Sequence, residues 1–530
     1  ETLLADPAAL HDGDEELSWE EKARRERMRE TTSGIVGYST DDAVARAVFM
    51  LSGGLYAADL VDVGPVRPLE VAGPVLDPRL SPDGEHVAYV AERSLRVCRW
   101  DGSQDRALAE PTHPLESCGT ADFAAAEELD RQRGFWWSPA SDAVLVERVD
   151  ETSVQEWWIA DPVHPERAPH AHRYPAAGTP NAALSLQIVR LDGAVLDVAW
   201  DSTAFEYLVD VSWTGDGPPL ALVSTRDQRT QQVLAVDTAT GATTVMAELT
   251  DPCWVDAVPG ATRWSPDGRL LTHRVDPDAD AYRLHLGDGW LTPADVQVRG
   301  ILDVGSDGVL VACAADPLTT SVGLAGWDGS WTVIADGTAP PAVFAARRGG
   351  GTTLLVSRSL DSLRARYEVR TAEGAVVEVV SWAETPVVDP GVHLLEAGPE
   401  RLRTAVLFPR DHVRGSRRLP VVLSPYGGPH HAEVVASRAA YCEDQWLADQ
   451  GFVVVVADGR GTPGRGPAWD RAILHDYANP VLDDQVTALH AVAEAFPDDI
   501  DLGRVGMRGW SFGGYLAALA VLGPGVHPPR

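Results

Sequence analysis

The sequence predicts two folds in one chain, an all-β propeller followed by a doubly wound α/β domain with a parallel sheet. A length of 530 residues is too great for one compact core. Short strand-like runs broken by glycine, aspartate and proline fill the chain from about residue 35 to 395. Near residue 396 the pattern changes to apolar strands that alternate with helices. We therefore expect an N-terminal helix and extension at 1–34, the propeller at 35–395 and a partial α/β domain at 396–530.

The composition is that of a soluble globular protein, with 45% hydrophobic and 23% charged residues. The 44 basic and 78 acidic side chains give a net charge of −34. This charge argues against nucleic acid or an anionic membrane as a partner, and it suits a substrate that carries a cationic amine. No apolar run reaches the length that spans a bilayer, and the opening residues do not predict a signal peptide.

The five cysteines are scattered along the chain, and none belongs to a Cys-x-x-Cys pair. An odd number in this arrangement favours free thiols in a reducing compartment over a disulfide framework or a metal site. We therefore expect a cytoplasmic protein without a metal or another cofactor.

A capping box, Ser18-Trp-Glu-Glu21, predicts the start of a helix in the N-terminal segment. The residues after it, 22–29, are mostly charged. We expect a helix that faces solvent and docks on a neighbouring domain.

A recurring turn predicts the propeller. Its copies are Ser81-Pro-Asp-Gly84, Trp137-Ser-Pro-Ala140 and Trp264-Ser-Pro-Asp-Gly268. Proline presets the first turn position, and Asp-Gly supplies the tight reversal. Each copy precedes a strand-like run, at 86–90, 143–146 and 269–273, and further hairpin signals lie at 101–102, 238–241 and 328–329. Such all-β repeats predict propeller blades, with a pair of β-sandwiches as the alternative.

One stretch of this region, residues 122–130, is helix-forming and carries adjacent acids at Glu127 and Glu128. Neighbouring carboxylates repel each other and usually form a solvated helix face, which is the reading that this segment alone favours. The alternative is a carboxylate pair that is aimed into the propeller tunnel and binds a protonated α-amine.

The C-terminal segment is predicted to alternate strands and helices, which gives a parallel sheet with helices on both faces. Strands are expected at 404–408, 419–424 and 452–457, helices at 436–450 and 483–496, and then a buried strand at 501–507 followed by a helix that includes 516–521.

Between that last strand and helix lies Arg508-Gly-Trp-Ser-Phe-Gly-Gly-Tyr515. Gly-x-Ser-x-Gly in this context predicts a nucleophile elbow, and with it an α/β-hydrolase fold. Gly509 and Gly513 would keep side chains out of the tight turn. Ser511 would hold its hydroxyl at the tip, with the Phe512 N–H directed at a developing oxyanion. The alternative is a glycine-rich turn whose serine only caps the helix.

Several motifs together carry a family resemblance. Tyr426-Gly-Gly-Pro429, Asp458-Gly-Arg-Gly461, Gly464-Arg-Gly466 and Gly509–Tyr515 are similar to the hydrolase half of the prolyl oligopeptidase family. The helix Ala126–Asp130, the run Gly134–Pro139 after it and the segment Arg173–Asn181 look like the dipeptidyl peptidase IV branch of that family. The resemblance covers most of the chain, and the combination is more specific than any single motif.

The resemblance implies a serine peptidase that releases dipeptides from free N-termini, with proline or alanine preferred at the second position. Ser511 would be the acylated nucleophile, and the Tyr426 hydroxyl and Phe512 N–H would form the oxyanion hole. Glu127 and Glu128 would hold the N-terminal amine of the substrate, which reverses the preference for a solvated helix face.

The resemblance leaves other roles open. Trp510 and Tyr515 would help to wall the specificity pocket, but packing explains them equally well. The branch also implies an arginine that contacts a substrate carbonyl, and Arg93, Arg96 and Arg99 are equal candidates. A homodimer in the full-length form and the absence of a cofactor are implied as well.

The chain departs from the family pattern after Ser511. In such hydrolases the acid and the histidine follow the serine, yet only residues 512–530 follow it here. His527 lies in a Pro/Gly-rich tail too close to the serine to be the base, and His430, His431 and His475 are better explained as solvated residues. A serine without a base is a poor nucleophile, so we expect a truncated and inactive peptidase whose incomplete sheet exposes an edge.

Two rival functions stay open. An acylaminoacyl peptidase or oligopeptidase would share this fold and differ in its use of Glu127 and Glu128. A non-catalytic propeller that binds peptides and carries a hydrolase remnant is the rival from a different class.

Overall fold

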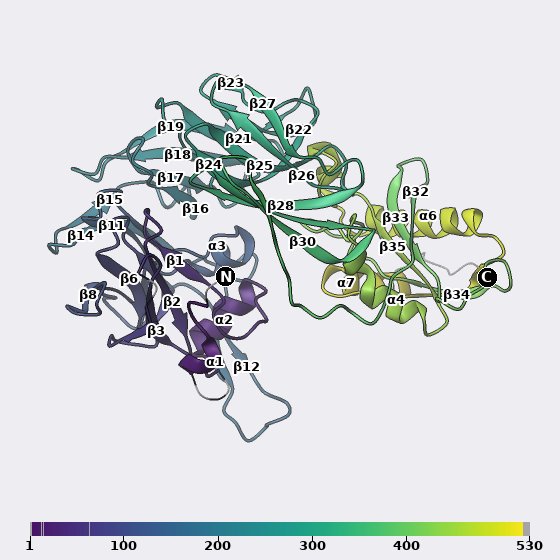
Figure 1. The fold of residues 1–530 in the computed structure, drawn as a ribbon, viewed down its shortest axis with the longest axis horizontal. Helices are drawn as coiled ribbons and strands as arrows, with labels where there is room; N and C mark the ends of the chain where they lie inside the picture. Colours follow the sequence, from purple (N-terminus) through teal and green to yellow (C-terminus); the bar gives the residue numbers. More distant parts are fainter. Residues whose placement is uncertain (1–2, 12, 14, 63, 523–530) are drawn as a thin grey trace. The chain divides into compact units, whose positions relative to one another are not determined.

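The computed structural model describes residues 3–11, 13, 15–62 and 64–522. The chain divides into two compact units, residues 1–271 and 272–530, and each is described by itself (Figure 1). Among the described residues, seven antiparallel sheets of four or five strands follow one another along the chain, a two-stranded hairpin is inserted in the third, and a five-stranded mixed sheet comes last. This order is a β-propeller followed by an α/β-hydrolase sheet, as the sequence predicted.

The chain begins with the short helix α1 (Pro7–Leu10) and with α2 (Trp19–Arg27). The Glu21 N–H donates to the Ser18 hydroxyl at 3.2 Å, which confirms the predicted cap. The expectation that this helix faces solvent was wrong for Glu21 and Arg25, which are buried. Arg25 forms ion pairs with Glu15 and Glu21, both at 2.8 Å, and this pairing makes the burial of its charge tolerable.

The first four blades lie in the N-terminal unit. They comprise β1 (Tyr38–Thr40), β2 (Arg46–Leu51), β3 (Gly54–Asp59) and β4 (Arg67–Leu69); β5 (Leu76–Leu80), β6 (His86–Ala91), β7 (Ser94–Arg99) and β8 (Arg106–Ala109); β9 (Glu116–Cys118), β10 (Phe135–Trp137), β11 (Ala143–Asp150), β14 (Ala183–Arg190) and β15 (Val195–Val198); and β16 (Tyr207–Ser212), β17 (Leu220–Ser224), β18 (Thr230–Val236) and β19 (Thr243–Thr250). Apolar clusters join each of these blades to the next, so the core runs between sheets.

The next three sheets complete the series. They comprise β20 (Arg263–Trp264), β21 (Leu270–Asp276), β22 (Ala281–Leu286) and β23 (Gly289–Trp290); β24 (Gln297–Gly305), β25 (Gly308–Ala314), β26 (Ser321–Gly326) and β27 (Trp331–Ala335); and β28 (Ala342–Gly349), β29 (Thr352–Ser359), β30 (Ser362–Arg370) and β31 (Val376–Val379). Seven separate small sheets exclude the predicted alternative of two β-sandwiches.

The recurring turn forms as predicted, and each copy connects two antiparallel strands of its blade. The Gly84 N–H donates to the Ser81 carbonyl at 2.9 Å, and the Ser81 hydroxyl donates to the Asp83 carboxylate at 2.6 Å. The backbone is left-handed at the end of each turn, with φ of 72° at Gly84, 79° at Gly268 and 61° at Ser141, the residue after Ala140. Glycine meets this requirement without strain, which explains Asp-Gly in two of the three copies.

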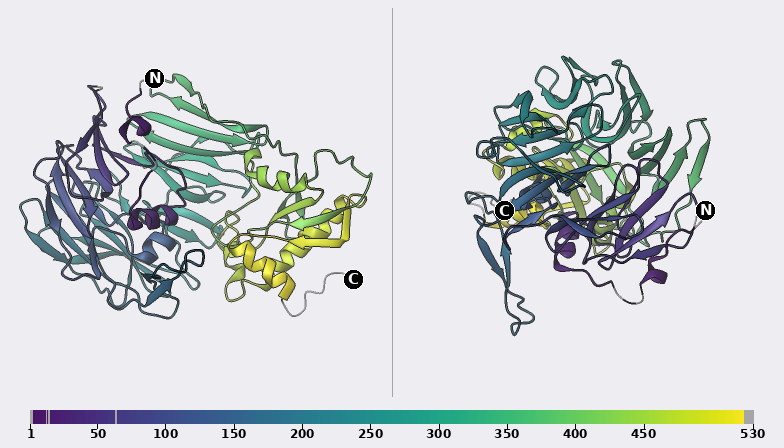
Figure 2. Two further views of the ribbon diagram at one scale, coloured as in Figure 1. Left: turned by 90° about the horizontal axis from the view of Figure 1, so that it is seen from below. Right: turned by 90° about the vertical axis from the view of Figure 1, so that its left-hand side faces the viewer.

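Two insertions interrupt the third blade. Helix α3 (Phe123–Glu128) lies between β9 and β10, close to its predicted bounds. A hairpin of β12 (Glu156–Ile159) and β13 (His170–Arg173) lies between β11 and β14. The hairpin extends away from the blades of its unit (Figure 2), and its Trp157, Trp158 and Ile159 side chains are exposed.

The last sheet has the strand order β32 (Val392–Ala397), β33 (Leu402–Leu407), β35 (Val453–Asp458), β34 (Leu419–Leu423) and β36 (Ile500–Met507). Its helices are η1 (Arg438–Tyr441), α4 (Cys442–Ala448), α5 (Pro467–Asp470), η2 (Arg471–Ile473), α6 (Asn479–Ala495) and α7 (Phe512–Leu522). Strand β34 is parallel to β35 and β36, whereas β33 is antiparallel to β32 and β35. Helix α4 packs on one face of β35 and α6 on the other, so the sheet is doubly wound (Figure 1).

Strand β36 forms where predicted, but the expectation that it is buried was wrong. It is the edge strand, paired only with β34, and residues 503–506 within it are exposed. An edge strand has one neighbour instead of two, so its exposure follows from the strand order and not from its own residues. Helix α6 also begins earlier than expected, at Asn479, because Pro480 suits the first turn of a helix.

Candidate active site

The turn between β36 and α7 has the geometry of a nucleophile elbow. Ser511 is left-handed at φ 51°, a conformation that costs a residue with a side chain about 1–3 kcal/mol. Its carbonyl accepts the Tyr515 N–H at 3.1 Å, so α7 starts directly after it. Ser511 is exposed, and within the described part of the chain its hydroxyl has no hydrogen-bond partner. The hydroxyl therefore does not serve the helix as a cap.

The two glycines of the motif allow the turn to close. A Cβ at Gly509 would lie 2.1 Å from the carbonyl carbon of Gly513, and one at Gly513 would lie 2.1 Å from the Pro425 carbonyl oxygen. Both neighbours are backbone atoms that cannot move aside. This confirms the prediction that neither position accommodates a side chain.

The Tyr426 turn packs against the first turn of α7. A Cβ at Gly428 would lie 2.7 Å from the Phe512 ring, and one at Gly427 would lie 2.8 Å from the Leu516 side chain. The ring centroids of Tyr426 and Phe512 are 6.2 Å apart. Tertiary folding thus brings together Tyr426 and Phe512, and with Phe512 its chain neighbour Ser511.

The two predicted pocket residues differ in their surroundings. Tyr515 stacks obliquely on Phe512 at 5.5 Å and on Tyr477 at 5.9 Å. Trp510 is 88% exposed and has no aromatic neighbour in the described ranges. Sequence reasoning missed Tyr477, which lies in the loop before α6, because nothing in its local sequence sets it apart.

Ion pairs hold Arg508, the residue at the start of the elbow, to the first turn of α4. Arg508 pairs with Glu443 at 2.8 Å and with Asp444 at 3.6 Å, and it donates to the Ser424 hydroxyl at 3.1 Å. Burial raises the pKa of Asp444 to about 6, although the hydroxyl of Ser424 and the charge of Arg508 oppose this shift.

A second buried acid holds the segment after Tyr426. The Asp458 carboxylate accepts the N–H groups of Glu433 at 3.1 Å and Val434 at 2.8 Å. Burial raises the pKa of Asp458 to about 6. The His431 ring lies edge-on to Tyr426 at 5.3 Å, and its contact with Glu433 raises its pKa.

No histidine of the described chain forms a hydrogen bond with Ser511. His430 and His475 are exposed, and His431 pairs with Glu433 at 3.5 Å. His527 lies outside the described residues.

The acid pair occupies the end of α3. Asp122 caps this helix, since its carboxylate accepts the N–H groups of Ala124 at 2.9 Å and Ala125 at 3.3 Å. Glu127 forms an ion pair with Arg29 at 2.8 Å, whereas the exposed Glu128 has no partner among the described residues. The Arg29 contact joins positions far apart in the sequence, and no sequence signal pointed to it.

The three arginines considered from the sequence have other contacts. Arg93 pairs with Glu151 at 2.7 Å, and Arg96 pairs with Asp105 at 2.9 Å. Arg99 donates to Gln104 at 3.3 Å. Among the described arginines, Arg29 is the one that forms an ion pair with a member of the acid pair.

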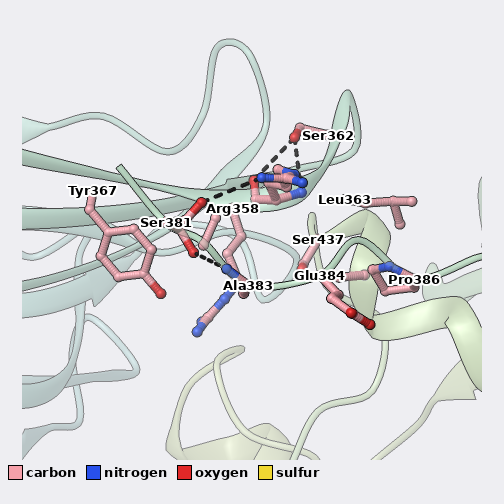
Figure 3. A pocket seen from close by; sticks show the side chains of 12 residues that line it. Arg358, Ser362, Leu363, Tyr367, Ser381, Ala383, Glu384, Pro386 and Ser437 are labelled. Carbon is pink, nitrogen blue, oxygen red and sulfur yellow. Dashed lines mark hydrogen bonds between the residues drawn. The ribbon is translucent and has the colours of Figure 1, made fainter. Parts of the chain in front are cut away.

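Other candidate features lie apart from these residues. A pocket of about 200 Å³ in the second unit is lined by Arg358, Arg364 and Tyr367 beside residues 381–386 (Figure 3), and it contains none of the predicted site residues. The described residues include no group of three or more histidine, cysteine or acidic side chains placed to hold a metal ion. Across the same residues no helix is long and apolar enough to cross a membrane.

Comparison with known proteins matches both halves of the chain. Residues 49–276 match the model of the dipeptidyl peptidase IV N-terminal region, and residues 439–526 match that of the prolyl oligopeptidase family. Dipeptidyl peptidase 8 of Mus musculus is 24% identical over 95% of this chain and 69% of its own length. Its counterpart in Homo sapiens is 22% identical over the same shares.

The fold also matches a solved structure. Porphyromonas gingivalis dipeptidyl peptidase 4 superposes with a TM-score of 0.78 at 21% identity, over 93% of this chain and 74% of that one. The seven sheets, the elbow at Ser511 and the two family matches agree with one another. The chain belongs to the prolyl oligopeptidase family, in its dipeptidyl peptidase IV branch.

Proposed function

We propose that this protein is a serine peptidase scaffold that releases dipeptides from the free N-terminus of peptides. The observation that carries the proposal is Ser511, which lies next to Phe512 and the Tyr426 turn, with a strained backbone and an exposed hydroxyl that has no hydrogen-bond partner in the described part of the chain. Strain at a serine in a strand-to-helix turn is typical of a nucleophile.

The proposed reaction is acyl transfer. The Ser511 oxygen attacks the carbonyl carbon of the second residue, and the Tyr426 hydroxyl and Phe512 N–H stabilise the oxyanion that forms. The serine proton passes through a base to the leaving amine, which departs as the carbon–nitrogen bond breaks. Water then hydrolyses the ester, which regenerates the hydroxyl and releases the dipeptide.

Glu127 and Glu128 would bind the protonated amine of the same peptide and thereby fix the cleavage position. A charge-assisted contact to an ammonium group is strong when water is excluded. Arg29 already occupies one oxygen of Glu127, so Glu128, which has no partner among the described residues, offers the carboxylate that is open to the amine. Trp510 and Tyr515 would favour a small or cyclic second residue such as alanine or proline.

No histidine among the described residues forms a hydrogen bond with Ser511, and we propose that acylation is slow in this chain. Loss of a triad member in serine peptidases lowers kcat by about 10⁴- to 10⁶-fold. A second candidate function, peptide binding without catalysis, is favoured by the same observation.

Two measurements on the 530-residue chain test the proposal. Calorimetry compares binding of Ala-Pro-Ala with its N-acetyl form, in the wild type and in a Glu127→Gln/Glu128→Gln variant. We expect a preference for the free amine that the double variant loses; equal affinity for both peptides, or a preference for the acetylated one, would favour the acylaminoacyl peptidase alternative instead.

The rate at which a fluorophosphonate labels Ser511 measures the reactivity of its hydroxyl group. We expect slow labelling of the wild type and no labelling of Ser511→Ala. Turnover of Ala-Pro-p-nitroanilide at an ordinary peptidase rate, about 1–10³ s⁻¹, would show that a base is present after all. Complete absence of labelling alongside intact amine binding would favour the binding function.

Location and assembly are proposals of the same kind. The five cysteines form no disulfide, and three of them are buried, as suits a reducing compartment such as the cytoplasm. The exposed Trp157, Trp158 and Ile159 of the β12–β13 hairpin suit an interface with a second copy. Sedimentation of the wild type and of a hairpin variant with these three residues changed to serine would test the homodimer.

A further inference from the structure

A buried cluster of charged side chains lies directly behind the acid helix. Arg131, just after α3, is 6% exposed, and Glu147 on β11 is fully buried. The third member is Asp122, the cap of α3, which is 7% exposed. Charges are rarely buried in this way unless they are paired and hydrogen-bonded.

Arg131 uses its whole guanidinium group in this cluster. Its Nη1 and Nη2 bind both oxygens of Glu147, the latter at 2.9 Å. Nη2 also reaches Asp122 at 3.4 Å, and Nε donates to the Leu208 carbonyl of β16 at 3.1 Å. The arginine therefore connects the start of α3 to two blades of the propeller.

The chain after α3 is fixed by further contacts. The Arg131 N–H donates to the Ala125 carbonyl at 3.1 Å, and the Gln132 side chain donates to the Ala126 carbonyl at 2.6 Å. These bonds satisfy carbonyl groups that the end of a helix leaves unpaired. Both ends of α3 thus depend on the segment that carries Arg131.

A helix of six residues has no stability of its own in water. Its position must come from what holds it, and the contacts that hold it converge on Arg131. Although burial opposes its charge, the ion pair with Glu147 raises the pKa of Arg131, so the guanidinium stays charged. A neutral side chain could not replace the fork that binds Glu147 and Asp122 together.

We propose that Arg131 is a positioning residue that sets where Glu127 and Glu128 point, through its contacts with Asp122 and Glu147. It acts from behind the helix and does not itself touch the peptide. This inference rests on the proposed binding of the peptide amine by the acid pair, and it adds the residue that decides the geometry of that binding.

The test combines a ligand measurement with one that needs no ligand. Arg131→Met, Arg131→Lys and Glu147→Gln are compared with Arg190→Met, a control that breaks the exposed pair of Arg190 and Asp142 in the same blade. Calorimetry gives the preference of each variant for Ala-Pro-Ala over its N-acetyl form. Amide hydrogen exchange gives the protection of residues 123–129.

We expect Arg131→Met to lower the preference for the free amine about tenfold or more, the loss of one well-placed charged contact. Arg131→Lys should restore part of it, since it keeps the charge but not the fork. Exchange at residues 123–129 should rise in Arg131→Met and Glu147→Gln and stay unchanged in Arg190→Met. If Arg131→Met fails to fold, Glu147→Gln, which keeps the shape of the side chain, carries the test.

Wild-type protection of α3 and an unchanged amine preference in Arg131→Met or Glu147→Gln would overturn the inference. Failure of the proposed function would give a result that can be told apart from this one. In that case exchange would rise as expected, but the wild type would already bind both peptides equally, and the Glu127→Gln/Glu128→Gln variant would match it.

Discussion

Gly513→Ala places a methyl group where the elbow meets the Tyr426 turn. The new Cβ would lie 2.1 Å from the Pro425 carbonyl oxygen, 3.2 Å from its carbon and 3.4 Å from the Tyr426 Cα. An ordinary contact between carbon and oxygen is more than an ångström longer than the first of these distances. The obstacle is backbone that continues from a central strand of the sheet, so α7 and the turn must move apart.

We expect the variant to be less stable than the wild type by about 1–3 kcal/mol, the usual cost of overpacking a well-packed site. Because the methyl group separates Ser511 and Phe512 from Tyr426, labelling of Ser511 by a fluorophosphonate should also slow. Urea unfolding followed by tryptophan fluorescence measures the free energy of unfolding.

Gly506→Ala is the matched control, since a Cβ there has no atom within 4 Å on the exposed strand β36. Its free energy of unfolding should stay within about 0.5 kcal/mol of the wild type. If Gly513→Ala were as stable as Gly506→Ala and labelled at the wild-type rate, the close packing of the elbow on the Tyr426 turn would be refuted.

Three further contacts can be tested by substitution, by pH and by chemical modification. Arg29→Ala removes the partner of Glu127 and should strengthen binding of Ala-Pro-Ala by at most about fivefold, because an ion pair that is partly exposed is weak. Weaker binding would show that Arg29 assists the amine site. Burial raises the pKa of Asp458 to about 6 from an ordinary 3.8, so its stabilising effect is present below pH 4 and is lost as pH rises through 6. The free energy of unfolding of the wild type relative to Asp458→Asn should therefore fall between pH 4 and 7, and a difference that does not change with pH would contradict this. Burial also raises the pKa of Cys98 to about 12 and of Cys118 to about 11. Iodoacetamide should therefore modify the half-exposed Cys253 of the native protein first, as peptide mass spectrometry would show, and early modification of the Cys98 thiol would argue against its buried position.

The features that sequence reasoning placed correctly depend on residues close together in the chain. The Ser18 cap, the Ser-Pro-Asp-Gly turns and the glycines of the elbow all act within about five residues, and each formed as expected. Alternating strand patterns located the blades for the same reason. Periodicity of the side chains decides which face of an element is buried, whatever lies across from it.

The errors concern features that depend on distant parts of the chain. Strand β36 carries four apolar side chains among its eight residues, but its burial depends on having a neighbour on both sides, and the strand order gives it one. Arg25 was expected to be a solvated charge, but it is buried, and its ion pairs with two acids offset the cost of that burial.

By itself the sequence determined a series of β-turn repeats, an acid helix and a strand-to-helix turn around Ser511. The tertiary structure alone decided that Arg29 meets Glu127, that Arg131 holds α3 through Glu147, and that Tyr477 joins Phe512 and Tyr515 beside the serine. Turn and cap signals are local, because they depend on backbone hydrogen bonds between near neighbours. Contacts between side chains far apart in the chain exist only once the sheets have been packed, and no short pattern encodes them.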